Sequence, residues 1–208
     1  NNSTNTTSPN EPTLCGVIGG ASTWLGLHPA DDGVLVVDTL GSEVHTVAAL
    51  YLDTPINLVP VACDNNSGPD GRSSRLRTEV RRGQDYFLVV DGVNGAKGRI
   101  DLHWALGQPP VVQVTPTNQW VARGETLTLR VGVSGASPPA TCQWYLNDQP
   151  MAGATNTTLV VTNAQPVNAG LYSVVVVNAI EAVARVVARV ELEPVVASVA
   201  TSSFEDND

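Results

Sequence analysis

The chain has 208 residues, which is enough for one large domain or two ordinary ones, and none of its apolar runs approaches the ~20 residues of a membrane-spanning helix. Its formal net charge of −9 disfavours nucleic-acid binding, because the phosphates would be repelled. Lys97 is its one lysine, and Thr, Ser, Asn, Val and Gly dominate, a composition typical of extracellular β-proteins.

Residues 1–12 are polar and of low complexity, and they predict a leader that buries no apolar surface. The chain begins at Asn1 with neither an initiator Met nor a signal peptide, which suggests a processed chain or a segment of a longer protein. Asn-x-Ser/Thr acceptors crowd the first seven residues, and two more occur later, so we expect glycosylation of a secreted protein. The candidate acceptors are Asn2, Asn5, Asn65 and Asn156.

Residues 13–107 predict a β-sandwich. Short β-branched runs alternate with turns of Gly, Asp and Asn, and no helical period persists for 11 residues anywhere in the chain. The expected strands are 34–38, 47–51, 58–62, 86–90 and 99–104.

Three cysteines allow one disulfide and one leftover thiol. We expect Cys15 to pair with Cys63 and Cys142 to stay free as a small core hydrophobe. Closing a loop of about 48 residues would stabilise the fold by about 4 kcal/mol. The alternative is three buried free thiols.

Four blocks of the first half occur in the order found in a known family: 19–24, 41–51, 61–65 and 83–92. Together they resemble the bacterial pre-peptidase C-terminal domain, a jelly-roll-like β-sandwich appended to secreted proteins. The resemblance implies a non-catalytic module, and some relatives bind calcium or insoluble polymers. The family usually has Asp where this chain has His45.

A calcium site would need several converging oxygen ligands. The segment 64–70 is the richest in oxygen side chains, and the candidate ligands are Asp64, Asp70 and Asp91. The alternative is that these are ordinary turn residues.

The three histidines lie in different segments and the chain has no nucleophile-elbow motif, so no catalytic residue is predicted and the chain is not expected to be an enzyme.

Arginines cluster between positions 72 and 82 of this acidic chain. By the two-residue period of a strand, Arg75, Arg77 and Arg81 share one face, and they are candidate interface residues for an acidic partner. The alternative is a solvated outer face.

Residues 108–110 (Gln-Pro-Pro) predict a short linker to a second sandwich at 111–193. Trp144 and Tyr172 have the spacing of immunoglobulin strands C and F, but valines stand where the two core cysteines would be. This half resembles the I-set-like immunoglobulin modules of bacterial secreted and surface proteins, without the core disulfide. The predicted core is Val131, Trp144, Tyr172 and Val174.

Residues 194–208 have β-propensity but no place in either sandwich. Val196, Val199 and Phe204 are expected to anchor this tail as an intermolecular strand on an exposed sheet edge, with Glu205, Asp206 and Asp208 as an acidic end.

The sequence therefore predicts an all-β, two-domain protein, secreted or at the cell surface. The first hypothesis is a non-enzymatic subunit that self-associates into the homopolymer of a bacterial surface or extracellular fibre. The alternative is an accessory module of a larger secreted hydrolase or adhesin, holding polysaccharide or a surface protein. No cofactor is expected, and calcium is the one candidate.

Overall fold

The structure is a computed structural model that describes residues 2, 4, 11–115 and 117–193. These residues form two compact units. The first contains the described residues up to Val111, together with Ser134–Ala140 and Val177–Ala182. The second contains the described residues of Val112–Val133, Thr141–Val176 and the segment from Val183 onward.

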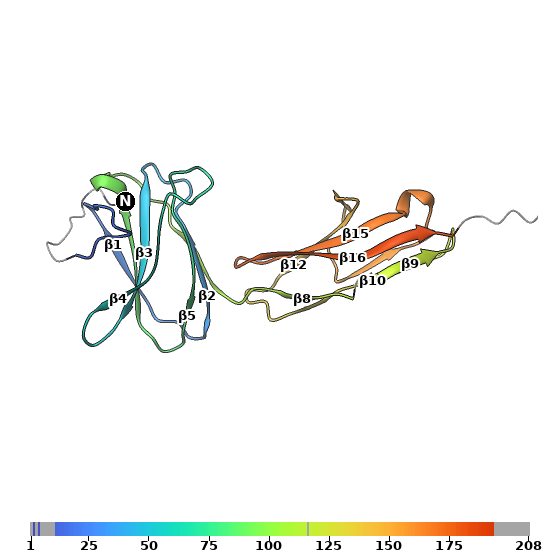
Figure 1. Ribbon diagram of the computed structural model, residues 1–208, viewed down its shortest axis with the longest axis horizontal. Coiled ribbons are helices and arrows are strands. Elements are labelled where there is room, and N and C mark those ends of the chain that lie inside the picture. Colours follow the sequence, from blue (N-terminus) through green and yellow to red (C-terminus); the bar gives the residue numbers. More distant parts are fainter. Residues whose placement is uncertain (1, 3, 5–10, 116, 194–208) are drawn as a thin grey trace, which may run out of the picture. The chain divides into compact units, whose positions relative to one another are not determined.

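The first unit is a two-layered β-sandwich (Figure 1). One sheet has the strand order β1-β6-β3-β4 and the other the order β5-β2-β7, and the strand pairs are antiparallel. The strands are β1 Thr23–Leu27, β2 Gly33–Asp38, β3 Thr46–Asp53, β4 Leu58–Asn65, β5 Arg75–Val80, β6 Tyr86–Gly92 and β7 His103–Gly107, with one 3-10 turn, η1 Val93–Gly95.

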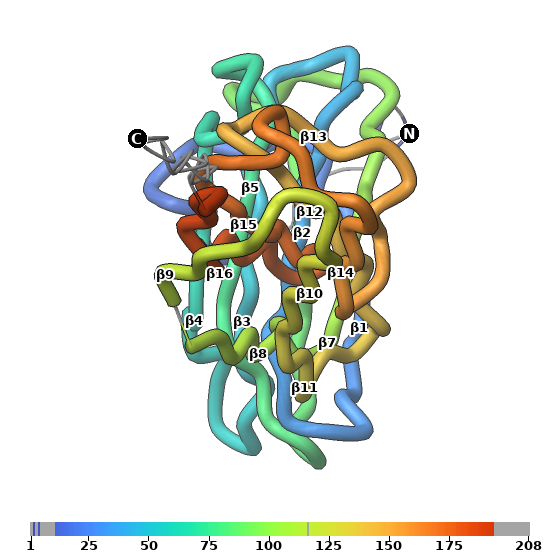
Figure 2. Tube along the Cα trace, turned by 90° about the vertical axis from the view of Figure 1, so that its right-hand side faces the viewer, coloured from blue at the N-terminus to red at the C-terminus, as the bar shows by residue number. Residues whose placement is uncertain are grey.

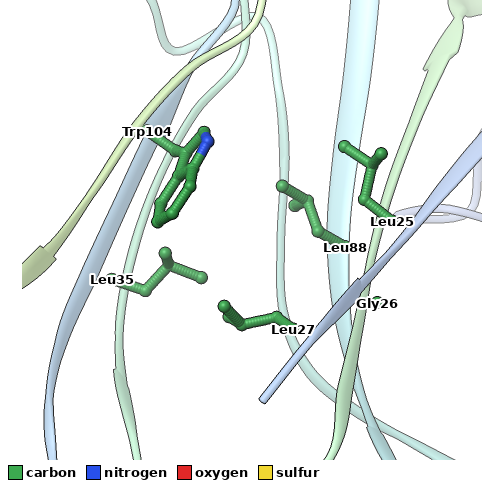
Figure 3. Close-up of a pocket in the computed structure, with 6 residues that line it drawn as sticks. All are labelled: Leu25, Gly26, Leu27, Leu35, Leu88 and Trp104. Carbon is green, nitrogen blue, oxygen red and sulfur yellow. The ribbon is translucent and has the colours of Figure 1, made fainter. Parts of the chain in front are cut away.

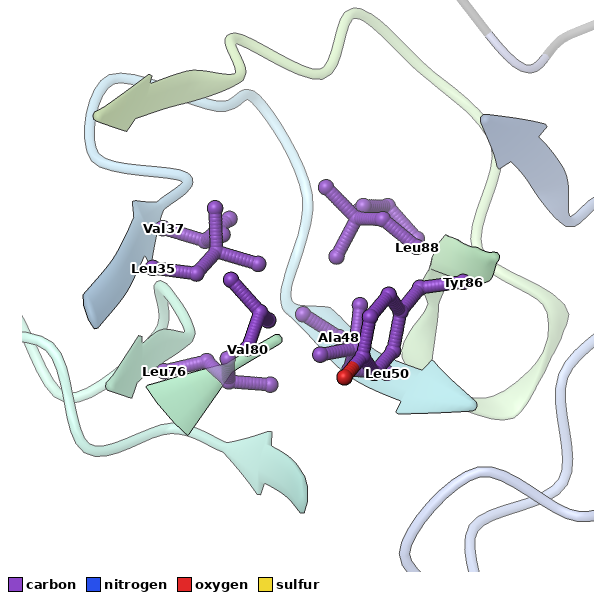
Figure 4. Packing of buried hydrophobic residues seen from close by; sticks show 9 residues of the cluster. Leu35, Val37, Ala48, Leu50, Leu76, Val80, Tyr86 and Leu88 are labelled. Atoms are coloured by element: carbon purple, nitrogen blue, oxygen red, sulfur yellow. The ribbon is translucent and has the colours of Figure 1, made fainter. Parts of the chain in front are cut away.

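The main core lies between these two sheets (Figure 4). In β5 the burial alternates as the sequence predicts: Leu76 and Val80 are buried, while Arg75, Arg77 and Glu79 are exposed. Strand β2 contributes apolar residues to the same layer by the same period. The buried residues are Leu35, Val37, Ala48, Leu50, Leu76, Val80, Tyr86, Leu88 and Val90.

Strand β3 is buried on both faces, which explains its continuous apolar run. Its residues Val47, Ala49 and Tyr51 pack on the outer side of the sheet, against Leu14 and Val89. The segment before β1 covers this side, and a disulfide between Cys15 and Cys63 joins that segment to β4. The Trp24 indole stacks on Tyr51, with ring centroids 6.0 Å apart, and so extends this outer cluster.

The predicted strand at 99–104 is wrong in its first part, because β7 begins only at His103. The backbone N–H of Arg99 donates to Glu43 Oε2 and that of Asp101 to Ser42 Oγ, so side chains replace the ladder partners that a strand would need. Conversely, no strand was predicted at β1, where Leu25 and Leu27 alternate with Trp24 and Gly26. These two differences bear directly on the site described below, because β1 and β7 border it.

The second unit contains a five-stranded sheet of order β13-β12-β15-β16-β9 and two smaller strand pairs, β10 with β14 and β11 with β8. Strand β9 pairs with β16 in parallel, and the two run side by side in Figure 2. The elements are β8 Val111–Gln113, β9 Thr117–Val121, β10 Leu127–Arg130, β11 Gly132–Ser134, β12 Thr141–Leu146, β13 Gln149–Pro150, β14 Thr158–Val161, η2 Pro166–Asn168, β15 Gly170–Val177 and β16 Ala182–Leu192.

The centre of the second unit is an indole without a disulfide beside it. The Trp144 side chain is fully buried, and its Nε1 donates a hydrogen bond of 2.7 Å to the carbonyl oxygen of Asn156. Val174 is also fully buried and Val131 is 7% exposed. The Tyr172 hydroxyl donates to the carbonyl oxygen of Asn168, at 2.7 Å, which is the hydrogen bond of an immunoglobulin tyrosine corner.

Cys142, on β12, is a free and buried cysteine. Burial raises the pKa of its thiol, which keeps the sulfur protonated and unreactive at neutral pH. Its position fits that of a small core hydrophobe.

Apart from the two 3-10 turns, the regular structure of the described residues is β, so the predicted all-β class with two tandem sandwiches is confirmed. Within the part of the chain that the structure describes, no helix has the length and hydropathy needed to cross a membrane.

Candidate functional site

The first sandwich is closed along one side and open along the other. On the closed side, the end of β4 bonds to the start of β5: the Arg75 N–H donates to Asp64 Oδ2, and Ser67 Oγ donates to the Arg75 carbonyl oxygen. On the other side lies an apolar cleft of about 190 Å³ (Figure 3). It is lined by residues of β1, β2, β6 and β7: Leu25, Gly26, Leu27, Leu35, Leu88 and Trp104.

Trp104 points toward the space between the sheets. It is the cross-strand partner of Val37, whose side chain is only 1% exposed, and cross-strand partners lie on the same side of a sheet. Leu25 is likewise the partner of Leu88, a core residue. Trp104 is nevertheless 61% exposed and Leu25 is 40% exposed. These side chains are therefore directed inward like core residues, but the described residues of the unit leave much of each one exposed.

The two strands that border the cleft are sheet edges. Among the described strands, β1 pairs with β6 alone and β7 with β2 alone. An edge strand that lacks a second neighbour offers a template for another extended segment. The cleft thus combines an apolar hollow with two strands that can each accept a partner.

The predicted arginine cluster lies at the other edge of the three-stranded sheet, which β5 forms. Arg75 and Arg77 are exposed on β5, and Arg81 is exposed one residue after it. Within the first unit, Arg77 Nη2 donates to Glu181 Oε2 at 2.9 Å, so this guanidinium already has an acidic partner. An ion pair this exposed contributes little to stability.

The prediction that Asp64, Asp70 and Asp91 form a calcium site is wrong. No group of three or more His, Cys, Asp or Glu side chains within the described residues is placed to hold a metal ion. Each carboxylate instead accepts hydrogen bonds from nearby chain: Asp64 from the amides of Ser67 and Arg75, and Asp70 from Arg72 and Ser73. Loop backbone thus takes the oxygens that a cation would need.

Asp91 is a buried structural carboxylate, only 1% exposed. Its two oxygens accept from the amides of Gly20 at 2.8 Å, Ala21 at 3.1 Å and Gly92 at 2.6 Å, and so hold the segment before β1 against β6.

Asp91→Asn is expected to lower the free energy of unfolding by about 2–3 kcal/mol, because an amide cannot accept at both ends. Urea denaturation would measure this loss of stability. Asp53→Asn is the control, because Asp53 is an exposed aspartate at the end of β3. Equal stability of the two variants would contradict this role.

Asp70 is an exposed turn residue with a low pKa. Hydrogen bonds from Ser73, first from its hydroxyl and then from its amide, lower the pKa of Asp70 from 3.8 to about 2. Because the pKa is depressed in the folded state, the turn is stabilised above pH 3.8, and this stabilisation is lost as the pH falls from 3.8 toward 2.

Ser73→Ala is expected to raise the pKa of Asp70 toward 3.8, since it removes the hydroxyl donor. NMR titration of the Asp70 carboxyl carbon would measure the change. Ser67→Ala, in the same loop but bonded to Arg75, is the matched control and should leave this pKa where it is.

The predicted glycosylation acceptors differ in accessibility. Asn2 is 1% exposed, its Nδ2 donates to the Ala96 carbonyl oxygen and its Oδ1 accepts from Gly98, so the expectation of a glycan there is wrong. Asn65 is half-buried at the end of β4, whereas Asn156 is exposed. Asn5 lies outside the described residues, as do the predicted tail anchors Val196, Val199 and Phe204.

No cleft was predicted from the sequence, although the sequence contains two signals for it. Leu25 and Leu27 alternate around Gly26, and Trp104 and Leu106 alternate around Ala105. Each pattern indicates a strand with one apolar face. Neither pattern says that the two strands border the same opening, since that depends on which sheet each strand joins.

Comparisons with known proteins identify a domain in the second half of the chain. Residues 109–178 match the immunoglobulin domain family. Among solved structures, the titin M4 domain is 20% identical, with a TM-score of 0.38, over 43% of this chain and all of that one. The N-terminal four immunoglobulin domains of Dscam1 isoform 6.9 are 16% identical, with a TM-score of 0.38, over 71% of this chain and 38% of that one. The first two immunoglobulin domains of DIP-gamma are 12% identical, with a TM-score of 0.37, over 83% of this chain and 98% of that one.

No curated protein matches the chain. The family match covers the segment that contains Trp144 and Tyr172, whose burial and hydrogen bonds are those of an immunoglobulin core. The chain therefore contains an immunoglobulin-like domain at residues 109–178, a kind of domain found in adhesion and structural proteins.

Proposed function

We propose that this protein is a non-enzymatic, extracellular structural protein, a repeating subunit of a bacterial surface or extracellular fibre that assembles through its terminal segments. The observation that carries the proposal is the open side of the first sandwich. There, inward-directed Trp104 and Leu25 are left uncovered between two edge strands. A strand supplied by another chain would cover them and complete the sheet.

Such a contact joins one surface of a subunit to a different surface of the next. Head-to-tail contacts of this kind build open filaments unless the rotation between subunits closes a ring. The exposed arginines Arg75 and Arg81 offer a second contact, because the acidic residues Glu205, Asp206 and Asp208 at the chain's end have the opposite charge.

The disulfide between Cys15 and Cys63 supports the extracellular location, because disulfides persist in oxidising compartments. Asn156 is the accessible acceptor for the glycosylation that we propose. The likeness of the first half to the pre-peptidase C-terminal domain fits the same setting, since that module is appended to secreted proteins.

Electron microscopy of the purified chain tests this function, with a version that ends at Pro194 for comparison. We expect filaments from the full chain and single particles from the shortened one, because the tail supplies the joining strand. Single particles from both would refute self-assembly. Filaments from both would show that the tail is not the joining element.

The alternative is a polysaccharide- or protein-binding accessory module of a larger secreted hydrolase or adhesin. The exposed indoles favour it: Trp104 is 61% exposed and Trp120 is 60% exposed. A carbohydrate platform needs several rings side by side, however, and these are the only exposed large aromatic side chains among the described residues, one in each unit. Co-sedimentation with insoluble polysaccharides, lost in Trp104→Ala or Trp120→Ala, would support this alternative.

A further inference from the structure

We propose that the cleft between β1 and β7 is the acceptor site for residues 195–204 of a second copy of this chain, with the Phe204 ring seated against Trp104. This inference rests on the proposed self-assembly and names the surface that performs it.

The cleft suits one aromatic side chain. Leu25, Leu27, Leu35 and Leu88 line it together with the Trp104 indole, and no charged residue contributes to the lining. Its volume is about 190 Å³. A cavity of roughly 150 Å³ lined by similar side chains binds benzene, so a phenyl ring fits here. An aromatic occupant would also gain a ring contact with the indole, in addition to the apolar area that it buries.

The backbone around the cleft favours an extended peptide over a small apolar molecule. A small molecule would cover Trp104 and Leu25 but would leave β1 and β7 as sheet edges. An extended segment covers the same side chains and pairs with an edge strand as well. Gly26 of β1 also lines the cleft and adds no side chain to its wall.

The tail has the sequence that this acceptor requires. Residues 195–204 (VVASVATSSF) contain no charge, glycine or proline, and Phe204 is their one aromatic residue. The chain's other phenylalanine, Phe87, already packs edge-on against Trp24. Ten residues in extended form span about 33 Å, which exceeds the length of five-residue β1 or β7. The two-residue period puts Val196 on the same face as Phe204 and Val199 on the opposite face.

Photo-cross-linking of the full chain tests the site. One chain carries p-azidophenylalanine at position 204, which keeps an aromatic ring there, and it is mixed with a ¹⁵N-labelled chain of natural sequence. After irradiation, mass spectrometry locates the cross-links. We expect them on the labelled chain, within residues 24–28 and 103–106. The same analogue at Val167, a 79% exposed residue of the second unit, is the matched control and should not mark these segments.

A second variant tests the acceptor directly. Leu25→Glu in the labelled chain places a charge in the cleft, and the cross-linked yield should fall roughly tenfold or more, because the carboxylate cannot be paired there. Leu25 is 40% exposed, so the fold should tolerate the change, and circular dichroism and the melting temperature would verify this. Val167→Glu should leave the yield unchanged.

The outcomes separate this inference from the proposed function. Cross-links elsewhere on the labelled chain, in material that still forms filaments, would refute the acceptor but keep the self-assembly. Cross-links confined to the unlabelled chain's own cleft would make the occupant intramolecular and overturn the second copy. If neither filaments nor cross-links form, both the inference and the proposed function are refuted. Native mass spectrometry could find a small apolar molecule bound to the natural chain and missing from the Leu25→Glu variant. That result would assign the cleft to a ligand and overturn the inference.

Discussion

Replacing Trp144 with alanine is expected to lower the free energy of unfolding of the second unit by about 3–5 kcal/mol, the range for a large aromatic residue removed from a core. The side chain is fully buried on β12, and its Nε1 donates to the carbonyl oxygen of Asn156. The change therefore leaves a cavity and also an unpaired buried carbonyl group. Because valines occupy the positions of the usual core cysteines, no disulfide limits this loss.

Urea denaturation followed by circular dichroism would measure the change in stability, and amide hydrogen exchange would assign it to peptides of the second unit. Trp120→Ala is the matched control, since Trp120 is 60% exposed and its removal should change stability by about 0.5 kcal/mol or less. Equal effects of the two substitutions would show that Trp144 is not the centre of this core.

Loss of the disulfide between Cys15 and Cys63 is expected to destabilise the first unit by about 4 kcal/mol, the chain-entropy value for the loop that it closes. The two residues are 48 positions apart, and Cys15 holds the segment that covers the outer side of β3. Cys15→Ala combined with Cys63→Ala should therefore also increase hydrogen exchange around Val47 and Tyr51, since their covering segment is released.

Each single substitution should cost about as much as the double one, because either breaks the same bond. Cys142→Ala is the control, for it leaves the disulfide intact and removes one sulfur from the other unit. Peptide mapping without reduction should recover Cys15 linked to Cys63. A double variant as stable as the natural chain would show that packing alone holds the covering segment.

The local patterns of the sequence predicted much of the fold. In β5, the alternation of Leu76 and Val80 with the arginines correctly predicts which face is buried. The spacing of Trp144 and Tyr172 correctly indicates an immunoglobulin-like sandwich. These successes share a cause: strand period and motif spacing depend on residues that are close in the sequence or belong to a recurrent architecture.

The errors arose where side chains distant in the sequence take over backbone groups. Residues 99–101 alternate like a strand, but the side chains of Glu43 and Ser42 accept hydrogen bonds from the amides of Arg99 and Asp101. Asp91 was a candidate calcium ligand, but its carboxylate accepts hydrogen bonds from amides about 70 positions earlier. Asn2 has the sequence of a glycan acceptor, yet its side chain bonds to the backbone of Ala96 and Gly98.

The candidate site shows the same division most clearly. By itself, the sequence determined an all-β chain, an immunoglobulin-like second domain, an arginine-bearing outer face and a tail rich in valine. The tertiary structure alone decided that β1 and β7 form edges on the same side of the first sandwich, with Leu25 and Trp104 directed inward and uncovered between them. The two-residue period of a strand determines which side chains share a face. The order of strands in a sheet depends instead on contacts between distant segments, so the open side of a sandwich is a property of its topology.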